Sequence, residues 1–301
     1  MEKTNLGKSS NIRKTLLRLG LIKDENIIIF SEKTRDKKDL IVYKDIKTKV
    51  LFIDKYYVGN KEYESGKYRN ESQPLMPNTN GDYEDMIDTE RRYKKYRQFV
   101  INKKICDFGC GEGNFLRLSK PFAKFASGIE IQKNFNDAIN KEGIKCFSKL
   151  EDLTEPLDTI FLFHCLEHLP DPSKTLREIY EKLKEKGEGK IVVEVPHAKD
   201  FLLDQLELES FKNFTLWSQH LILHTRESLH SFLEDAGFKN IHIEGVQRYG
   251  ISNHLNWLKN GKPGGHKSPL SIIETENLIN SYTDALSKLD ANDTLVAVAT
   301  T

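Results

Sequence analysis

Three glycines, Gly109, Gly111 and Gly113, alternate with other residues between two apolar stretches. The first stretch ends at Phe108 and is strand-like, and the second begins at Phe115 and suits a helix. Glycine adopts positive φ angles and lets a ligand approach the backbone closely. The start of a helix also presents N–H groups without intrahelical partners. The pattern therefore predicts a strand, a tight turn and a helix that together hold a nucleotide-like ligand.

Two carboxylates indicate which ligand this turn holds. The dinucleotide fingerprint is G-x-G-x-x-G, whereas this chain has G-x-G-x-G with Asp107 two residues before the first glycine. A carboxylate there would repel a pyrophosphate but accept hydrogen bonds from an ammonium group. Glu130 ends the next predicted strand, where it can accept both ribose hydroxyls of an adenosine, with Ile131 and Gln132 bordering the adenine. These features favour S-adenosylmethionine over a dehydrogenase cofactor; the alternative is a plain strand–turn–helix corner.

A third polar turn, FHCLEHLPDP, follows another apolar strand-like stretch. Its two prolines interrupt regular structure before a helix begins near Ser173. Glu167 and His168 in this turn could bind a metal, but two ligands make a poor site without further partners. We therefore expect no metal in this protein.

Histidines supply the candidate bases. S-adenosylmethionine carries its own leaving group, so methyl transfer requires a positioned acceptor and, for some acceptors, a base. Histidine titrates near neutral pH, and His220, His168 and His197 all follow predicted strands or lie in the segments that interrupt them. His220 is the leading candidate. The structural alternatives are a packing or capping role for His220 and hydrogen bonds that shape the turn for His168.

Two segments rich in aromatic, amide and basic residues interrupt the regular pattern, at 197–224 and at 247–269. Aromatic rings stack on sugars or bases, and a basic glycine loop can hold phosphate. We expect these segments to bind the acceptor, although an ordered surface loop would have the same composition. The predicted acceptor-binding residues are Trp217, Arg248, Tyr249, Asn253, His254, Lys262 and His266.

Strand and helix patterns alternate from residue 104 onward, which predicts an α/β fold with a parallel sheet between helices. The last strand follows its helix after a tight turn, so we expect it to be antiparallel. The predicted strands are Lys104–Phe108, Ser127–Ile131, Lys145–Phe147, Thr159–Phe163, Lys190–Val195, Asn240–Val246 and Thr294–Ala299. The predicted helices are Asp82–Ile101, Phe115–Phe122, Lys133–Lys141, Ser173–Lys184, Thr225–Ala236 and Glu274–Leu289.

Residues 1–80 form a predicted small N-terminal α+β unit, and residues 81–301 a second domain. The unit contains a helix candidate at Ile12–Leu21 and a meander of short strands at Asn26–Ser31, Leu40–Tyr43 and Lys49–Ile53. The polar stretch Tyr56–Pro77 has the composition of a linker or a flap.

Composition bounds the remaining possibilities. The net charge is +1 and no apolar run is long enough to span a membrane. Four cysteines without a CxxC pair disfavour a disulfide scaffold or a zinc knuckle. These features predict a cytoplasmic protein without a membrane partner, and the absence of a long basic groove makes a nucleic-acid partner unlikely.

The stretches ICDFGCGEGNFL, SGIEIQ and FHCLEHLPDP resemble the successive motifs of class I SAM-dependent methyltransferases, in particular the sugar and small-molecule branch. The resemblance covers about residues 100–300. It implies a Rossmann-like seven-stranded sheet in the order 3-2-1-4-5-7-6 with strand 7 antiparallel. It also implies a cofactor site, in which the glycine turn and Asp107 line the methionine part, Glu130 the ribose, and the third turn the floor under the sulfonium. The implied residues are Asp107, Gly109, Cys110, Gly111, Gly113, Glu130, Ile131, Gln132, His164, Cys165 and Leu166.

The resemblance departs from the family pattern near the acceptor. Sugar methyltransferases of this type carry a Glu-His pair here, and the chain has Gln219-His220 instead. Loss of the carboxylate disfavours C-methylation and favours O- or N-methylation. The 247–269 segment resembles a block of methyltransferases encoded with surface-polysaccharide enzymes, which implies a nucleotide-linked sugar as acceptor. The wider group often binds zinc through N-terminal cysteines, and residues 1–60 contain no cysteine.

Two other functions remain open at the sequence level. One is methylation of a macromolecule, RNA or protein, because Lys and Arg outnumber Asp and Glu by 14 to 8 in residues 1–58. The other is a non-catalytic methyltransferase-like partner subunit, and the N-terminal unit also makes a homodimer conceivable.

Overall fold

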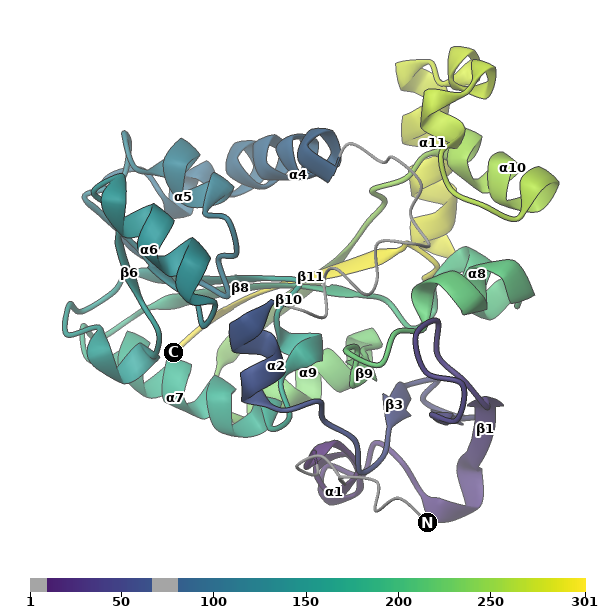
Figure 1. Ribbon diagram of the computed structural model, residues 1–301, viewed down its shortest axis with the longest axis horizontal. Coiled ribbons are helices and arrows are strands. Elements are labelled where there is room, and N and C mark those ends of the chain that lie inside the picture. Colours follow the sequence, from purple (N-terminus) through teal and green to yellow (C-terminus); the bar gives the residue numbers. More distant parts are fainter. Residues whose placement is uncertain (1–9, 67–80) are drawn as a thin grey trace.

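The computed structural model describes residues 10–66 and 81–301, and a seven-stranded sheet forms the centre of the described part (Figure 1). Its order is β10-β11-β8-β7-β4-β5-β6, with β11 antiparallel to both neighbours. This confirms the expected order and the antiparallel last strand. The strands are β4 (Lys104–Phe108), β5 (Phe125–Ile129), β6 (Lys145–Phe147), β7 (Thr159–Phe163), β8 (Lys190–Pro196), β10 (Lys239–Val246) and β11 (Thr294–Thr300).

Helices cover both faces of the sheet, as Figure 1 shows, with α4, α5 and α6 on one side and α7 and α9 on the other. Two helix starts have strong caps. Asp171 accepts the Lys174 N–H before α7, and Thr225 forms a capping box with Ser228 before α9. These helices are α4 (Gly81–Tyr96), α5 (Asn114–Ser119), α6 (Lys133–Lys141), α7 (Pro172–Lys184), α9 (Arg226–Asp235) and, near the end of the chain, α11 (Glu276–Lys288). Within residues 10–66 and 81–301, no helix has the length and apolarity to cross a membrane.

The N-terminal meander is present, but it has a fourth strand that the sequence did not indicate. After helix α1 (Ile12–Arg18), strands β1 (Ile27–Ser31), β2 (Val42–Asp45) and β3 (Leu51–Ile53) pair antiparallel. Strand β9 (Ile222–Leu223), from the 197–224 segment, then pairs with β3. The N-terminal unit and this segment are therefore parts of one sheet.

A continuous apolar core joins the N-terminal unit to the main sheet. Ile12, Leu16 and Phe52 share one buried cluster with Leu162 of β7 and Leu229 of α9. The boundary expected at residue 80 falls at the end of residues 67–80, which lie outside the described part of the chain, so this division stays a prediction.

Three segments expected to be irregular contain helices. Part of the expected linker or flap forms α2 (Asn60–Ser65), while its residues from 67 on lie outside the described part. The 197–224 segment contains η6 (Phe201–Gln205) and α8 (Glu209–Thr215). The 247–269 segment contains α10 (Ile251–Asn260) and η7 (Gly265–Lys267). The remaining short turns are η1 (Asp24–Asn26), η3 (Arg97–Phe99), η4 (Leu150–Asp152), η5 (Leu166–His168) and η8 (Pro269–Ile273).

Helix α10 escaped prediction because its buried face is polar. Asn253 and Asn256 are buried, which an apolar periodicity cannot indicate. Asn253 Oδ1 accepts the Gly264 N–H at 2.9 Å, and Asn256 donates to the Lys262 carbonyl at 2.7 Å. These bonds satisfy the buried amides and fold the following loop back onto the helix.

We expect Ile222→Ala to lower the stability of the whole protein by about 2–5 kcal/mol, because the fully buried Ile222 pairs with Phe52 of the N-terminal sheet. Urea unfolding followed by tryptophan fluorescence and by far-UV circular dichroism should give one shared transition that shifts to lower urea. Ile272→Ala is the matched control, because that side chain is 83% exposed. Two separate transitions, with only one affected by Ile222→Ala, would contradict a single joined core.

Candidate active site

The glycine turn needs glycine for conformation and for space. Gly109, Gly111 and Gly113 all have positive φ. The N–H groups of Gly109 and Cys110 donate to the Ile129 carbonyl at 2.8 and 3.1 Å, which fixes the turn to strand β5. A Cβ atom on Gly109 would lie 2.5 Å from the Cys165 sulfur. The turn after β4 therefore packs directly against the turn after β7.

Backbone hydrogen bonds orient the Glu130 carboxylate just after β5. Oε2 accepts the Gly111 N–H at 2.8 Å and Oε1 accepts the Gln132 N–H at 2.7 Å. Glu130 is only 5% exposed and borders a cavity. The glycine turn thus holds the carboxylate that the sequence assigns to a ribose.

A cavity of about 250 Å³ lies over the glycine turn. Its lining includes six residues predicted for the cofactor, namely Gly109, Glu130, Ile131, Gln132, His164 and Cys165. Ser148 borders it too. A carboxylate, apolar side chains and a close backbone turn match the ribose, adenine and sulfonium parts of S-adenosylmethionine, so the described residues fit this cofactor.

The other predicted cofactor residues do not line this cavity. Cys110, Gly111 and Gly113 belong to the turn but do not line the cavity, and Leu166 is fully buried in the core. Asp107 is 4% exposed, and burial raises its pKa to about 7. A nearby ammonium group would favour the ionised form of this carboxyl. Their roles toward the cofactor stay predictions.

Two tyrosines from the N-terminal unit also line this cavity over the glycine turn, the proposed cofactor cavity. Tyr57 and Tyr63 stack with ring centroids 5.9 Å apart. Burial raises the pKa of Tyr57 to about 12, so its ring stays neutral. Tyr63 precedes the end of α2, in the stretch expected to be a linker or flap. The N-terminal unit therefore contributes to this cavity, which the glycine motif alone does not indicate.

His164 lies between two buried carboxylates. Its Nδ1 is 3.3 Å from Glu167 Oε1 and its Nε2 is 3.2 Å from Glu194 Oε1. Burial alone would lower the pKa of His164, but its contacts with Glu167 and Glu194 outweigh burial and raise that pKa. His164 also has a φ of 50° and donates its N–H to the Glu194 carbonyl at 2.9 Å. The turn after β7 is thereby fixed to β8.

Glu194 is a fully buried carboxylate on β8 with several cationic partners. Arg91 and Arg92 of α4 reach it at 2.9 and 2.7 Å. Burial would raise the pKa of Glu194, but Arg92, His164 and Arg91 hold it well below the usual range. Arg91 also pairs with Asp88 at 3.0 Å, so the network extends along α4.

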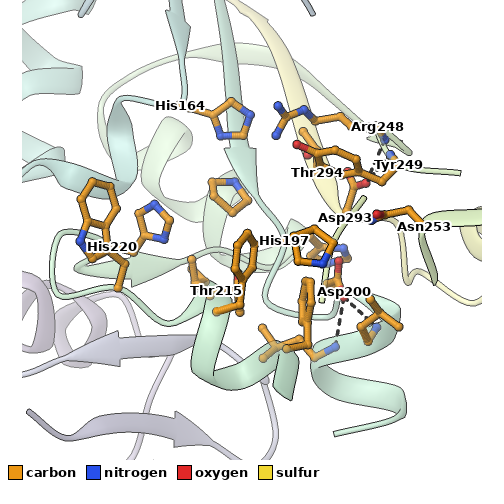
Figure 2. Close-up of a pocket in the computed structure, with 18 of the residues that line it drawn as sticks. His164, His197, Asp200, Thr215, His220, Arg248, Tyr249, Asn253, Asp293 and Thr294 are labelled. Atoms are coloured by element: carbon orange, nitrogen blue, oxygen red, sulfur yellow. Dashed lines mark hydrogen bonds between the residues drawn. The ribbon is translucent and has the colours of Figure 1, made fainter. Parts of the chain in front are cut away.

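A second cavity of about 330 Å³ adjoins the first, and His164 and His168 line both. Figure 2 shows His164, His220 and Arg248 at different sides of it, brought together from three separate segments. Arg248 is anchored to Asp88 of α4 at 2.9 Å. Of the predicted catalytic and acceptor residues, this cavity is lined by His168, His197, His220, Trp217, Arg248, Tyr249, Asn253, His254 and His266.

Lys262 is the predicted acceptor residue that does not line this cavity, although its neighbours Pro263 and Gly264 do. The cavity is also lined by Arg35, Glu167 and Asp293, which were not predicted for the acceptor, and by Asp200, Phe211 and Phe214 of the 197–224 segment, which was. Arg35 comes from the N-terminal unit and lies 4.2 Å from the centroid of the Trp217 ring. Arg35 and Asp293 come from segments distant from the predicted ones, so sequence spacing does not connect them to the site.

The two deeper histidines are neutral at neutral pH. Burial and the nearby His168 lower the pKa of His220 to about 3, and burial lowers that of His197 to about 4. His197 Nδ1 lies 2.9 Å from the Asn292 carbonyl, which only accepts, so that nitrogen carries the proton. Burial and the charge of Asp293 raise the pKa of Asp200 to about 7. The cavity thus offers neutral imidazoles beside carboxyl groups.

Comparison with known proteins agrees with this geometry. The pattern of the family described as "Methyltransferase domain" matches residues 85–243, about half of the chain. The chain belongs to this family. It is a SAM-dependent methyltransferase, with S-adenosylmethionine as its cofactor. No curated protein sequence matches it.

Two solved methyltransferase structures are similar to this chain, and the first supports the fold. A SAM-dependent methyltransferase from Archaeoglobus fulgidus is 21% identical with a TM-score of 0.51, covering 78% of this chain and 99% of that one. Magnesium protoporphyrin IX methyltransferase from Synechocystis PCC 6803, solved with bound SAH, is 11% identical with a TM-score of 0.47, covering 80% and 97%.

We expect Gly109→Ala to weaken S-adenosylmethionine binding by roughly tenfold or more, because the new Cβ would displace Cys165 and the turn that carries it. Gly20→Ala is a matched control. Gly20 has a similar φ of 70° and open space around its Cβ position, so it carries the same backbone strain of about 1–2 kcal/mol away from the cavity. Isothermal titration with S-adenosylmethionine measures both, and equal weakening in the two variants would contradict the assignment.

We expect Glu194→Gln to lower stability by about 3–5 kcal/mol at pH 7, because Arg91 and Arg92 lose their buried counter-charge. The pKa of Glu194 lies below 4.5 in the folded state, so its contribution is present above pH 4.5 and is lost as the pH falls below it. The gap between wild type and variant in urea unfolding should therefore narrow in acid. Glu188→Gln, at an exposed ion pair with Lys190, serves as control. A gap that is independent of pH would refute the charged role.

Proposed function

We propose that this methyltransferase transfers a methyl group to an oxygen or nitrogen of a small polar acceptor of the sugar class, either nucleotide-linked or free. The observation that carries this proposal is that the cofactor cavity and the second cavity share His164 and His168. An acceptor in the second cavity therefore lies next to the donor. The volume of about 330 Å³ is in the range of small-molecule sites.

The lining of the second cavity supports a sugar. Phe211, Phe214 and Trp217 offer ring faces against which a pyranose can pack. Asp200 and Asp293 offer carboxyl oxygens for hydroxyl groups. Asp293 Oδ2 accepts the N–H groups of Arg248 and Tyr249 at 2.9 and 3.1 Å, which fixes the carboxylate in the wall. This pairing of aromatic faces with fixed polar groups is how proteins orient small ligands.

The nucleotide part of such an acceptor has weaker support. The N–H groups of Gly264 and Gly265 already donate to Asn253 Oδ1 at 2.9 and 3.3 Å, so they do not offer a phosphate nest. Arg248 is committed to Asp88. Lys262 stays a candidate for a phosphate beyond the cavity. A comparison of free and nucleotide-linked sugars as substrates separates the two acceptor classes.

His220 is the proposed base. Bound S-adenosylmethionine supplies an electrophilic methyl group on its sulfonium. The protein must hold the acceptor and remove a proton where the acceptor carries one. The His220 ring is neutral at neutral pH and lines the second cavity. This imidazole can take the acceptor proton as the new bond to the methyl group forms, and His197 is a secondary candidate.

We expect His220→Ala to reduce kcat by roughly 10²–10⁴-fold with little change in S-adenosylmethionine affinity. The assay measures formation of S-adenosylhomocysteine with a panel of nucleotide sugars, free sugars and small amines. His230→Ala, at a half-exposed position on α9, is the control and should keep wild-type turnover. Unimpaired turnover in His220→Ala would remove His220 from the mechanism, and no turnover on any member of the panel would refute the acceptor class.

A further inference from the structure

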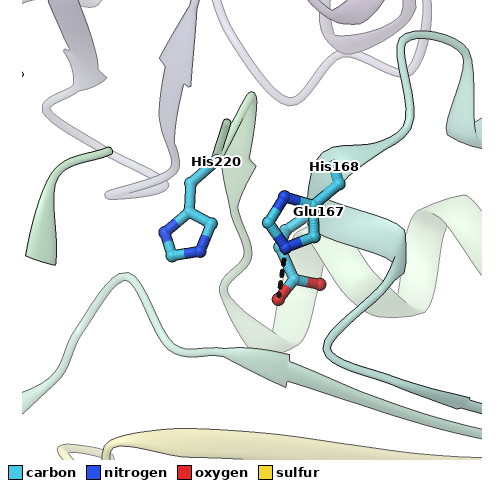
Figure 3. A group of neighbouring side chains, drawn as sticks. All are labelled: Glu167, His168 and His220. Atoms are coloured by element: carbon cyan, nitrogen blue, oxygen red, sulfur yellow. Dashed lines mark ion pairs between the residues drawn. The ribbon is translucent and has the colours of Figure 1, made fainter. Parts of the chain in front are cut away.

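Three potential metal ligands meet in the wall of the second cavity, which is the proposed acceptor cavity. Glu167, His168 and His220 each offer one ligand atom, and these atoms lie within 4.8 Å of one another. Figure 3 shows the two imidazoles and the carboxylate facing a common space. The expectation of no metal rested on a pair of ligands, Glu167 and His168. The fold adds His220 as a third.

Two hydrogen bonds hold the turn at Glu167 and His168 against the segment that carries His220. The Leu221 N–H donates to the Glu167 carbonyl at 2.8 Å. His168 Nδ1 lies 2.9 Å from the Gln219 carbonyl. These two contacts flank His220 in sequence, so they fix its segment against η5. The position of His220 beside Glu167 is therefore built into the backbone.

The hydrogen bond to the Gln219 carbonyl also determines which nitrogen of His168 carries a proton. A carbonyl oxygen only accepts, so Nδ1 must carry the proton, and the Nε2 lone pair of a neutral ring faces Glu167 Oε1 at 4.0 Å. A proton or a metal cation between this lone pair and the carboxylate would stabilise the arrangement. An imidazole whose other nitrogen donates to a backbone carbonyl is the usual form of a histidine metal ligand.

Glu167 and His220 each have a buried side-chain atom without a well-aligned hydrogen bond to a described residue. Glu167 has an exposed fraction of 0%, yet neither of its oxygens makes a well-aligned hydrogen bond with a described residue. His220 Nδ1 is likewise buried without such a partner among the described residues. Buried polar atoms without partners are costly and call for an explanation. A bound cation would give the Glu167 carboxylate a second positive partner beside His164, whose Nδ1 lies 3.3 Å from Oε1.

We propose that Glu167, His168 and His220 bind one divalent cation of the zinc class. Two imidazoles and one carboxylate form a donor set of catalytic zinc sites, which keep an open position for water or substrate. Imidazole ligands favour zinc and its first-row neighbours over magnesium, which prefers oxygen. All three side chains line the acceptor cavity, so the open position faces the acceptor.

The cation changes how the acceptor is activated, and this consequence rests on the proposed function. A cation takes up the ligand lone pair of His220, which then no longer acts as the base. An acceptor hydroxyl that coordinates the cation becomes more acidic and loses its proton to solvent more readily. Metal binding itself depends only on the three side chains and can be tested without an acceptor.

The test uses the full chain without a polyhistidine tag, freed of metal with EDTA and dialysed. Isothermal titration with Zn²⁺ and visible absorption during titration with Co²⁺ measure binding, and Mg²⁺ is the comparison cation. We expect one equivalent of Zn²⁺ to bind and to displace Co²⁺, and Mg²⁺ to bind far more weakly. Glu167→Gln and His220→Asn should each weaken Zn²⁺ binding at least about tenfold. His266→Ala, in the same cavity but outside the cluster, should leave it unchanged.

Circular dichroism of each metal-free variant checks that it is folded. If Glu167→Gln unfolds the chain, the Zn²⁺ affinity of His220→Asn alone tests the proposal. Absence of Zn²⁺ binding, or binding unchanged in the folded cluster variants, would overturn the proposal and make His168–Glu167 a proton-bridged pair. Turnover that persists in EDTA without any Zn²⁺ binding overturns this inference but leaves the proposed function standing. Zn²⁺ binding at the cluster without turnover on any acceptor supports this inference and refutes the proposed acceptor.

Discussion

The burial of Glu194 is the constraint on which the candidate active site depends. An ionised carboxylate inside a protein costs several kcal/mol unless cations and hydrogen bonds surround it. Glu194 is fully buried on β8, so Arg91 and Arg92 of α4 and His164 after β7 must all reach it. Helix α4, which precedes β4 in the chain, is thereby fixed over the carboxyl end of the seven-stranded sheet. Removing one partner would leave the others buried with unbalanced charge.

This network positions both cavities at once. His164 borders the cofactor cavity and the acceptor cavity, so the residue that neutralises Glu194 also forms their shared wall. Asp88 of α4 pairs with Arg91 and with Arg248, which ties the segment after β10 to the same helix. Arg248 in turn lines the acceptor cavity. Ion pairs of low exposure therefore connect the cofactor side of the site to the acceptor side.

Local patterns predicted much of the fold, and long-range contacts escaped prediction. Parallel strands such as β7 are buried on both faces and appear in the sequence as apolar runs, and the glycine turn with Glu130 is a short-range motif. The order of the strands came from family resemblance. The pairing of β9 with β3 and the contributions of Tyr57, Tyr63 and Arg35 join segments whose spacing carries no signal. Glu194 did carry a sequence signal, because a lone glutamate in the apolar strand KIVVEVP requires buried partners.

His164 and His168 form the boundary between the cavities, but different parts of the molecule hold them. His164 is fixed by the central sheet through Glu194, whereas His168 is fixed by the Gln219 carbonyl in the segment that β9 ties to the N-terminal sheet. The donor side thus depends on the sheet that defines the family fold. The acceptor side depends on the N-terminal unit and its paired segment, which also place His220 and Arg35. Changes there can alter the proposed acceptor cavity and the positions of Glu167, His168 and His220 while the glycine turn and Glu130 stay in place, because different parts of the fold support the two cavities.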